Sequence, residues 1–256
     1  VIGYSSGVSA CEKCGLWQDA LLLLREAAEG ELELDIVIYN AAISACEKGA
    51  QWQRALFFLT EMRQAKLEPD VISTSAGISA CEKGGRWQHA LSLLREMGGA
   101  MLELNIVSYG ACTSACEKGG HWWEALFLIR EVEVSGLELN VVCCSAGISA
   151  CEKGGHWQQA LSLLSHMRST QLEPDEISFS AGISAYEKGG QWQGALFLFK
   201  GMAEAKVKLN VVSLSAVVSA CEKGGEWQRA VALLREMGQA VVELNVVSYS
   251  AGISAC

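Results

Sequence analysis

Hydrophobic and polar positions repeat along the chain with a period of thirty-five residues. Trp at the seventeenth position and Ala at the twentieth occur in all seven complete copies, counted from Val1. No residues are inserted between the copies, so we predict a single repeat array over residues 1–256 rather than separate domains. The predicted units are residues 1–35, 36–70, 71–105, 106–140, 141–175, 176–210 and 211–245, with a partial unit at 246–256.

Each unit has the pattern of two short helices. In the second unit, residues 39–48 are rich in small helix-compatible side chains and end at a turn that contains Gly49. The segment after the turn places apolar side chains three or four residues apart: Trp52, Ala55, Leu56, Leu59 and Met62. That spacing puts them on one face of a helix. Helices of about eleven residues are not stable alone in water, so we expect the hairpins to stack into an all-α solenoid.

Serines and glycines indicate where the first helix of a unit begins, where it ends and where it packs closely against neighbouring helices. Ser at the third position is expected to be its N-cap, in Ser73, Ser108, Ser178, Ser213 and Ser248. The glycine pair that usually follows, as in Gly84 and Gly85, is expected to supply the left-handed backbone conformation that closes a helix. Glycines inside the first helix, such as Gly77 and Gly147, are expected to allow neighbouring helices to approach closely. We expect an eighth first helix to begin near Ser248.

Charge and composition exclude two classes of function. The formal net charge is −9, from 20 basic and 29 acidic residues, so bulk positive charge cannot attract nucleic acid to this chain. Nucleic-acid binding would depend on cations placed at particular positions. No apolar run reaches the eighteen or so residues that a membrane span needs, so no membrane association is predicted.

Cysteines and histidines do not form a recognisable metal or catalytic motif. Seven of the 11 Cys share the eleventh position of a unit, where we expect small buried residues in a reducing compartment: Cys11, Cys46, Cys81, Cys116, Cys151, Cys221 and Cys256. Cys11 and Cys14 form a single C-x-x-C without a second pair, and the four His lack ligand spacing. There is also no P-loop, dinucleotide, nucleophile or deaminase motif. We therefore predict no enzyme activity, no metal and no small-molecule cofactor.

The unit from Ile36 to Asp70, IVIYNAAISACEKGAQWQRALFFLTEMRQAKLEPD, resembles a pentatricopeptide repeat. It opens with two β-branched residues, a Tyr and an Asn, has a Lys before a glycine-containing turn and an Ala-Leu pair in the second helix, and ends on Pro-Asp. A tetratricopeptide repeat has thirty-four residues and carries its Trp in the first helix. The resemblance implies a right-handed superhelical solenoid of helix-turn-helix repeats. It also implies binding of single-stranded RNA, one nucleotide per repeat, in RNA processing, editing or stability in a plastid or mitochondrion.

By this resemblance, the fifth and the last residue of each unit read the RNA base. The pairs are Ser5 with Asp35, Asn40 with Asp70, Ser75 with Asn105, Gly110 with Asn140, Ser145 with Asp175, Ser180 with Asn210, and Ser215 with Asn245. Asp accepts from the ring N–H of guanine or uracil, whereas Asn can also donate to the ring acceptor of adenine. From the RNA 5′ end, the implied sequence is G, U, A, unspecified, G, A, A. The alternative is that Asp or Asn only caps the following helix.

Three further series have a functional and a structural interpretation. The aliphatic residues at position two sandwich the base by resemblance, or else pack in the core: Ile2, Val37, Ile72, Val107, Val142, Ile177 and Val212. The lysines at position thirteen contact phosphates by resemblance, or stabilise a helix C-terminus: Lys13, Lys48, Lys83, Lys118, Lys153, Lys188 and Lys223. The Trp series heads the apolar stripe of the second helix, which favours core packing over a stacking platform for bases.

Two other functions stay open. A solenoid of this kind can instead be a protein-interaction scaffold that binds a peptide or a partner helix, as tetratricopeptide solenoids do. The sequence begins at Val1 and stops inside a unit at Cys256, so we expect it to be part of a longer protein. In that case, a catalytic domain for RNA beyond Cys256 is a third possibility.

Overall fold

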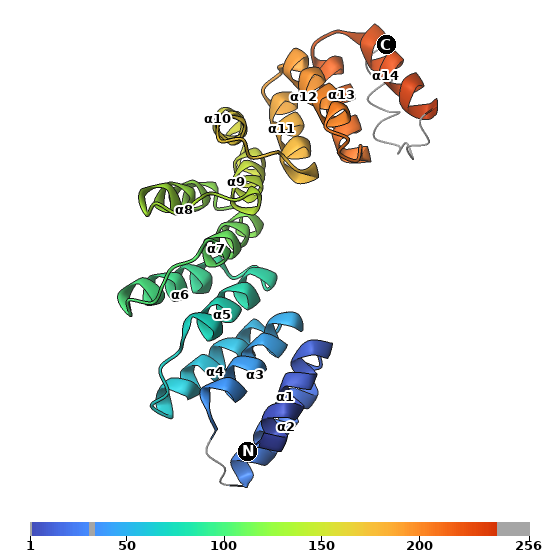
Figure 1. The fold of residues 1–256 in the computed structure, drawn as a ribbon. Coiled ribbons are helices and arrows are strands. Elements are labelled where there is room, and N and C mark those ends of the chain that lie inside the picture. Colours follow the sequence, from blue (N-terminus) through green and yellow to red (C-terminus); the bar gives the residue numbers. More distant parts are fainter. Residues whose placement is uncertain (1, 31–33, 240–256) are drawn as a thin grey trace. The chain divides into compact units, whose positions relative to one another are not determined.

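The computed structural model describes residues 2–30 and 34–239, and this part of the chain is built from helices joined by short turns (Figure 1). It contains fourteen helices and no strand. The helices are α1 (Ile2–Cys14), α2 (Trp17–Glu29), α3 (Ile36–Lys48), α4 (Trp52–Gln64), α5 (Val71–Lys83), α6 (Trp87–Gly99), α7 (Ile106–Gly119), α8 (Trp122–Val134), α9 (Val141–Lys153), α10 (Trp157–Ser169), α11 (Glu176–Lys188), α12 (Trp192–Glu204), α13 (Val211–Lys223) and α14 (Trp227–Gln239).

The helices follow the thirty-five-residue register of the sequence. Each unit supplies one hairpin, and from α3 onward every first helix begins at the first residue of its unit. The helices have thirteen or fourteen residues rather than the eleven expected. Seven hairpins are thereby confirmed. The eighth first helix, expected near Ser248, lies outside the described residues.

The first helices are capped by the last residue of the preceding unit, so the prediction that Ser at position three is the N-cap is wrong. Asp35 Oδ1 accepts a hydrogen bond of 2.9 Å from the N–H of Ile38. The same bond, between 2.7 and 2.9 Å long, is made by Asp70, Asn105, Asn140, Asp175 and Asn210. Ser73 is instead the third helical residue, and its hydroxyl accepts from the N–H of Asp70, which completes a capping box.

The glycine pair after the first helix has two separate roles. The second glycine has the predicted left-handed conformation, as in Gly85 (φ 65°) and Gly155 (φ 78°). Ala50 takes the same conformation in the second unit (φ 53°), although an L side chain makes it unfavourable. The first glycine makes room for the Trp of the preceding unit. A Cβ added at Gly154 would lie only 2.7 Å from Trp122 Cδ1.

The Trp series therefore connects consecutive hairpins. The indole of one unit lies against the first glycine of the next pair in Trp17–Gly49, Trp52–Gly84, Trp122–Gly154, Trp157–Gly189 and Trp192–Gly224. These Trp side chains are half-buried, which agrees with packing. Trp227, whose next unit lies outside the described residues, is 49% exposed.

The chain divides into two compact parts, each of several repeat units. One consists of residues up to Gly119 with Arg130–Glu138, and the other of Gly120–Ile129 with residues from Leu139 onward. In the first, α1, α3, α5 and α7 stack in order, and α2, α4 and α6 each pack on the next first helix (Figure 1). In the second, α9, α11 and α13 stack in the same way. No described helix is long and apolar enough to cross a membrane. That all repeats form one continuous array remains a prediction.

Small residues allow this stacking. Gly77 lies where an added Cβ would be 2.7 Å from Leu59 Cδ1 of the preceding hairpin, which confirms the expected close approach. The Ala at position twenty is at most 1% exposed in every unit. The position-eleven cysteines are buried where expected in Cys46, Cys81, Cys116, Cys151 and Cys221, whereas Cys11 is half-buried and Cys256 lies outside the described residues. Burial raises the pKa of the Cys46 thiol to about 11 and that of Cys81 to about 12.

Candidate functional site

The residues predicted to read a base are brought together in pairs, although they are thirty residues apart in the sequence. Asn40 Nδ2 donates a hydrogen bond of 2.9 Å to Asp70 Oδ2. In the fifth unit, Ser145 Oγ donates to Asp175 Oδ1 at 3.0 Å. In the sixth unit, Asn210 Nδ2 donates to Ser180 Oγ at 3.0 Å. Each pair joins the first turns of a first helix to the N-cap of the next one.

The remaining pairs are arranged less directly. Ser75 and Asn105 are linked through Ser108, whose Oγ lies 2.9 Å from Ser75 Oγ and whose N–H donates to Asn105 Oδ1. Ser5 and Asp35 make no direct hydrogen bond in the described part of the chain. Gly110 is buried in α7 and has no side chain, while Asn140 caps α9.

The seventh pair is described only in part. Ser215 is half-buried on α13, and its hydroxyl donates to Val211 O at 2.8 Å. Asn245, its predicted partner, lies outside the described residues.

In the second and sixth units, the helix cap and the contact with the fifth residue use different atoms of the same side chain, so capping and the predicted base reading are compatible there; in the fifth unit, Asp175 Oδ1 makes both contacts. In Asp70 and Asn210, Oδ1 accepts the backbone bond that caps the helix. The other atom, Oδ2 in Asp70 and Nδ2 in Asn210, is thereby directed at the fifth residue of the unit. Exchanging Asp for Asn therefore replaces an acceptor with a donor at a fixed place. Such an exchange is what a residue that distinguishes bases requires.

Asp70 is held in its charged form. Burial by itself would raise the pKa of this carboxyl, but hydrogen bonds from the Ser73 N–H, the Asn40 amide and the Ser73 hydroxyl together lower the pKa below its usual value. Asp70 is consequently an acceptor without a proton to donate at neutral pH.

The aliphatic residues at position two are exposed, so the interpretation that they pack in the core is wrong. Val37, Ile72, Val107, Val142, Ile177 and Val212 are between 57% and 64% exposed. Each residue turns a helix by about 100°, so the next two positions face the core instead. Ile38 and Tyr39, at positions three and four, are 1% and 6% exposed. The structure does not describe the side chain of Ile2.

In the sixth unit, the predicted residues line one pocket of about 280 Å³. Ile177 and Val212 contribute aliphatic side chains, and Ser180 and Asn210 contribute the polar pair. Lys153 and Glu176 also line it. Residues of all three predicted kinds, base-reading, base-sandwiching and phosphate-binding, thus meet at one place.

The position-thirteen lysines form ion pairs with glutamates of the preceding unit. The distance between Nζ and the carboxylate is 3.6 Å for Lys48–Glu12, 2.9 Å for Lys83–Glu47 and 2.8 Å for Lys188–Glu152. Lys118–Glu82 and Lys223–Glu187 are paired in the same way. Several of these lysines also donate to the glutamate's backbone carbonyl, as Lys48 does to Glu12 O at 2.9 Å. The helix C-terminus interpretation therefore has direct support, and a phosphate would have to compete with a carboxylate.

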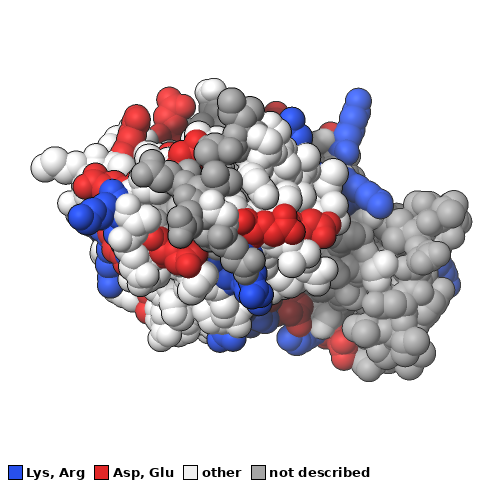
Figure 2. Space-filling view, turned by 90° about the horizontal axis from the view of Figure 1, so that it is seen from below, with Lys and Arg blue, Asp and Glu red and all other residues white. Residues whose placement is uncertain are grey.

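The two remaining lysines also lie in the last turns of first helices. Lys13 lies in the last turn of α1, and Lys153 ends α9 at the rim of the pocket in the sixth unit. Basic and acidic side chains are interspersed on the face that Figure 2 shows, and no continuous basic patch is visible there. Among the described residues, no group of three or more His, Cys, Asp or Glu could hold a metal ion.

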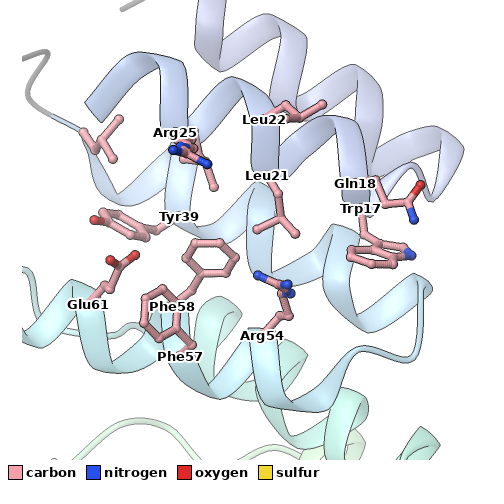
Figure 3. Close-up of a pocket in the computed structure, with 12 residues that line it drawn as sticks. Trp17, Gln18, Leu21, Leu22, Arg25, Tyr39, Arg54, Phe57, Phe58 and Glu61 are labelled. Carbon is pink, nitrogen blue, oxygen red and sulfur yellow. The ribbon is translucent and has the colours of Figure 1, made fainter. Parts of the chain in front are cut away.

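A second pocket lies away from these residues and was not predicted from the sequence. It measures about 590 Å³ and is lined by apolar side chains of α2 and α4, among them Leu21, Phe57 and Phe58, together with Tyr39 of α3 (Figure 3). Phe57 is 55% exposed. Burial raises the pKa of Glu61, which faces this pocket. The sequence does not single this pocket out, because the position of Phe57 also holds Phe127 and Phe197 in two other units and Leu22 in a third.

Two family models match this sequence. The model described as the pentatricopeptide repeat domain matches residues 22–84, 127–188 and 197–256. The model described as the PPR repeat matches residues 78–100, 107–137 and 177–207. The comparison with curated proteins gave no match.

Solved structures with the same fold come from two plants. The pentatricopeptide repeat protein PPR10 in complex with an 18-nt psaJ RNA element has a TM-score of 0.83 and 20% identity, over 98% of this chain and 37% of its own. PPR10 from maize gives a TM-score of 0.65 at 25% identity, over 96% and 35% of the two chains. The PPR domain of Arabidopsis thaliana protein-only RNase P 1 in complex with tRNA gives 0.60 at 16% identity, over 67% and 90%.

The chain thus spans little more than a third of the length of PPR10. These similarities confirm the prediction of an all-α solenoid of helical hairpins. Because the first family model covers well over half of the sequence, and because the described helices follow the same hairpin register, the chain belongs to the pentatricopeptide repeat family.

Proposed function

We propose that this array binds single-stranded RNA sequence-selectively, with one nucleotide read by each unit. The observation that carries the proposal is the hydrogen-bonded pairing of fifth and last residues, as in Asn40–Asp70 and Ser180–Asn210, beside a row of exposed aliphatic side chains. Short polar side chains on rigid helices suit the Watson–Crick edge of an unstacked base, and aliphatic side chains suit its faces. The complexes of PPR10 and of the RNase P domain with RNA support the same function.

The proposed setting is RNA processing, editing or stability in a plastid or mitochondrion. This setting rests on membership of the family. We expect the array to select the RNA and not to cleave it.

The second unit provides the sharpest test because Asn40 with Asp70 is the only pair that implies a pyrimidine. RNAs that differ only at the second base would be compared in competition binding. Wild type is expected to favour uracil, Asn40→Ser to shift the preference towards guanine, and Asp70→Asn to weaken the discrimination for uracil. A base contact of this type is worth about 1–3 kcal/mol, so each change is measurable. Unchanged preferences in both variants would contradict the proposal.

A protein-interaction scaffold is the second candidate, and the pocket beside Phe57 favours it. Its apolar lining and its volume of about 590 Å³ suit a side chain from a partner peptide or helix. The two candidates use different residues. Phe57→Ala should leave RNA binding unchanged under the first proposal, and it should weaken binding of a protein partner under the second.

A further inference from the structure

The sixth unit departs from the others at its first residue. Position one is aliphatic in Ile36, Val71, Ile106, Val141 and Val211, whereas the sixth unit has Glu176. Glu176 lines the pocket that also contains Ser180 and Asn210. The sixth unit therefore has a carboxylate in the pocket where, by the proposed function, the sixth base is read.

Glu176 accepts a hydrogen bond from Asn210 Nδ2, the atom that is expected to recognise adenine. Asn210 Nδ2 donates one hydrogen bond to Glu176 Oε1 at 2.8 Å and another to Ser180 Oγ at 3.0 Å. Asn210 Oδ1 accepts from the Ser213 N–H at 2.7 Å, which fixes the orientation of the amide. An amide NH₂ has only two hydrogens, so neither remains for the ring acceptor of adenine. To donate there, Asn210 would have to give up a bond, and the one to the carboxylate is charge-assisted and the stronger of the two.

The carboxylate itself favours a different base. Glu176 is an acceptor only, and after Oε1 takes the bond from Asn210, Oε2 still has its acceptor capacity. The Watson–Crick edge of guanine carries two adjacent donors, the ring N–H and the exocyclic amino group. Adenine carries one donor next to a ring acceptor, which would face the carboxylate oxygen unfavourably.

We propose that Glu176 is a specificity-determining residue that makes the sixth unit select guanine instead of the adenine implied by Ser180 and Asn210. This inference rests on the proposed RNA-binding function and assigns its sixth nucleotide. A glutamate at the first position of a helix also stabilises the helix dipole, and that role alone would change stability without changing base preference.

The experiment is a reciprocal exchange between the sixth and third units. The third unit has the same polar pair, Ser75 and Asn105, but Val71 at position one. Competition binding would compare RNAs that begin with the implied sequence and differ only at the sixth or third base. Wild type is expected to prefer guanine at base six and adenine at base three. Glu176→Val should reverse the ratio of affinities at base six, and Val71→Glu should move base three towards guanine, each by about fivefold or more.

The ratio of affinities is the readout because it cancels changes in overall affinity and in the folded fraction. If Glu176→Val alters the melting temperature but leaves the ratio at base six unchanged, while the other bases remain discriminated, the inference is wrong and RNA reading stands. If wild type discriminates no base at any unit, the proposed function fails, and this inference fails with it.

Discussion

At the scale of single residues, the last residue of a unit caps the next first helix and, by the proposed function, also reads a base. Asp and Asn are both good N-caps, so their restriction to this position agreed equally with capping and with base reading. The contacts leave room for both: in Asp70 and Asn210, one atom caps the helix and the other meets the fifth residue. The pairing was implied by the resemblance to pentatricopeptide repeats. The bond from Asn210 to Glu176 was not, because it depends on side-chain orientation.

Ala50 is a residue-scale point of strain that a single substitution should relieve. It has φ 53° where other units have glycine. The left-handed conformation costs an L residue about 1–2 kcal/mol, and Gly avoids this cost. The more flexible unfolded chain of Gly cancels part of that gain. We expect Ala50→Gly to stabilise the fold by about 0.5–1 kcal/mol, seen as a higher thermal midpoint by circular dichroism.

The matched control for Ala50 is Gly85→Ala at the same position of the third unit. Gly85 has φ 65°, and an added Cβ would meet nothing within 4 Å, so only the backbone conformation is tested. This variant should be destabilised. A lower midpoint for Ala50→Gly would show that the turn in the second unit does not have the described conformation.

At the scale of helices and hairpins, periodicity predicted two helices per unit because spacings of three and four report one buried face. The predicted N-cap lay three residues too late, since Ser and Asp are both favoured there and only the bonds to Ser73 distinguish them. The contact of Trp52 with Gly84 could not be predicted from the periodicity either. A periodic pattern identifies the face of a helix but not the residue of the next hairpin that it meets.

Tyr186 and Gly194 form a compensating pair within the sixth hairpin. Other described units have Cys at the first of these positions and a larger residue at the second. A Cβ on Gly194 would lie 2.6 Å from Tyr186 Cζ, so Gly194→Ala must displace the ring, at a cost of about 1 kcal/mol. With Tyr186→Cys in place, the same change should instead stabilise α12 by up to about 1 kcal/mol through helix propensity.

A double-mutant cycle on Tyr186 and Gly194, measured by thermal unfolding, checks this change of sign. Equal effects of Gly194→Ala in both backgrounds would mean that the two side chains do not share this space.

At the scale of the whole molecule, a net charge of −9 has to be reconciled with the proposed binding to a polyanion. The lysine series offers cations at regular intervals, yet Lys83 and Lys188 are each paired with a glutamate of the preceding unit. RNA phosphates would displace these carboxylates. The sequence did not predict that each of these lysines pairs with a glutamate of the preceding unit.

If these lysines contact phosphates, removing their glutamate partners should strengthen RNA binding without regard to sequence. The double variant Glu47→Gln with Glu82→Gln frees Lys83 and Lys118. We expect tighter binding to all RNAs and a steeper dependence of log affinity on log salt, whereas Lys83→Ala should lower that slope by about one unit or less.

The control for the released lysines changes the same number of charges elsewhere. Glu68 and Glu103 are exposed and have no ion pair with the described residues, so Glu68→Gln with Glu103→Gln alters net charge alone. Equal gains in affinity for the two double variants would remove the argument that the lysines meet phosphate.

The measurement that tests the account most directly is a pooled selection of single-stranded RNA by the wild-type array at a stated salt concentration. One nucleotide per unit predicts that the enriched RNAs share a motif that begins with G, U, A, any base and G. The fourth base should be the least restricted, because Gly110 has no side chain with which to share the reading. Recovery of no common motif, or of a motif unrelated to this order, would contradict RNA reading by the paired residues and favour the scaffold instead.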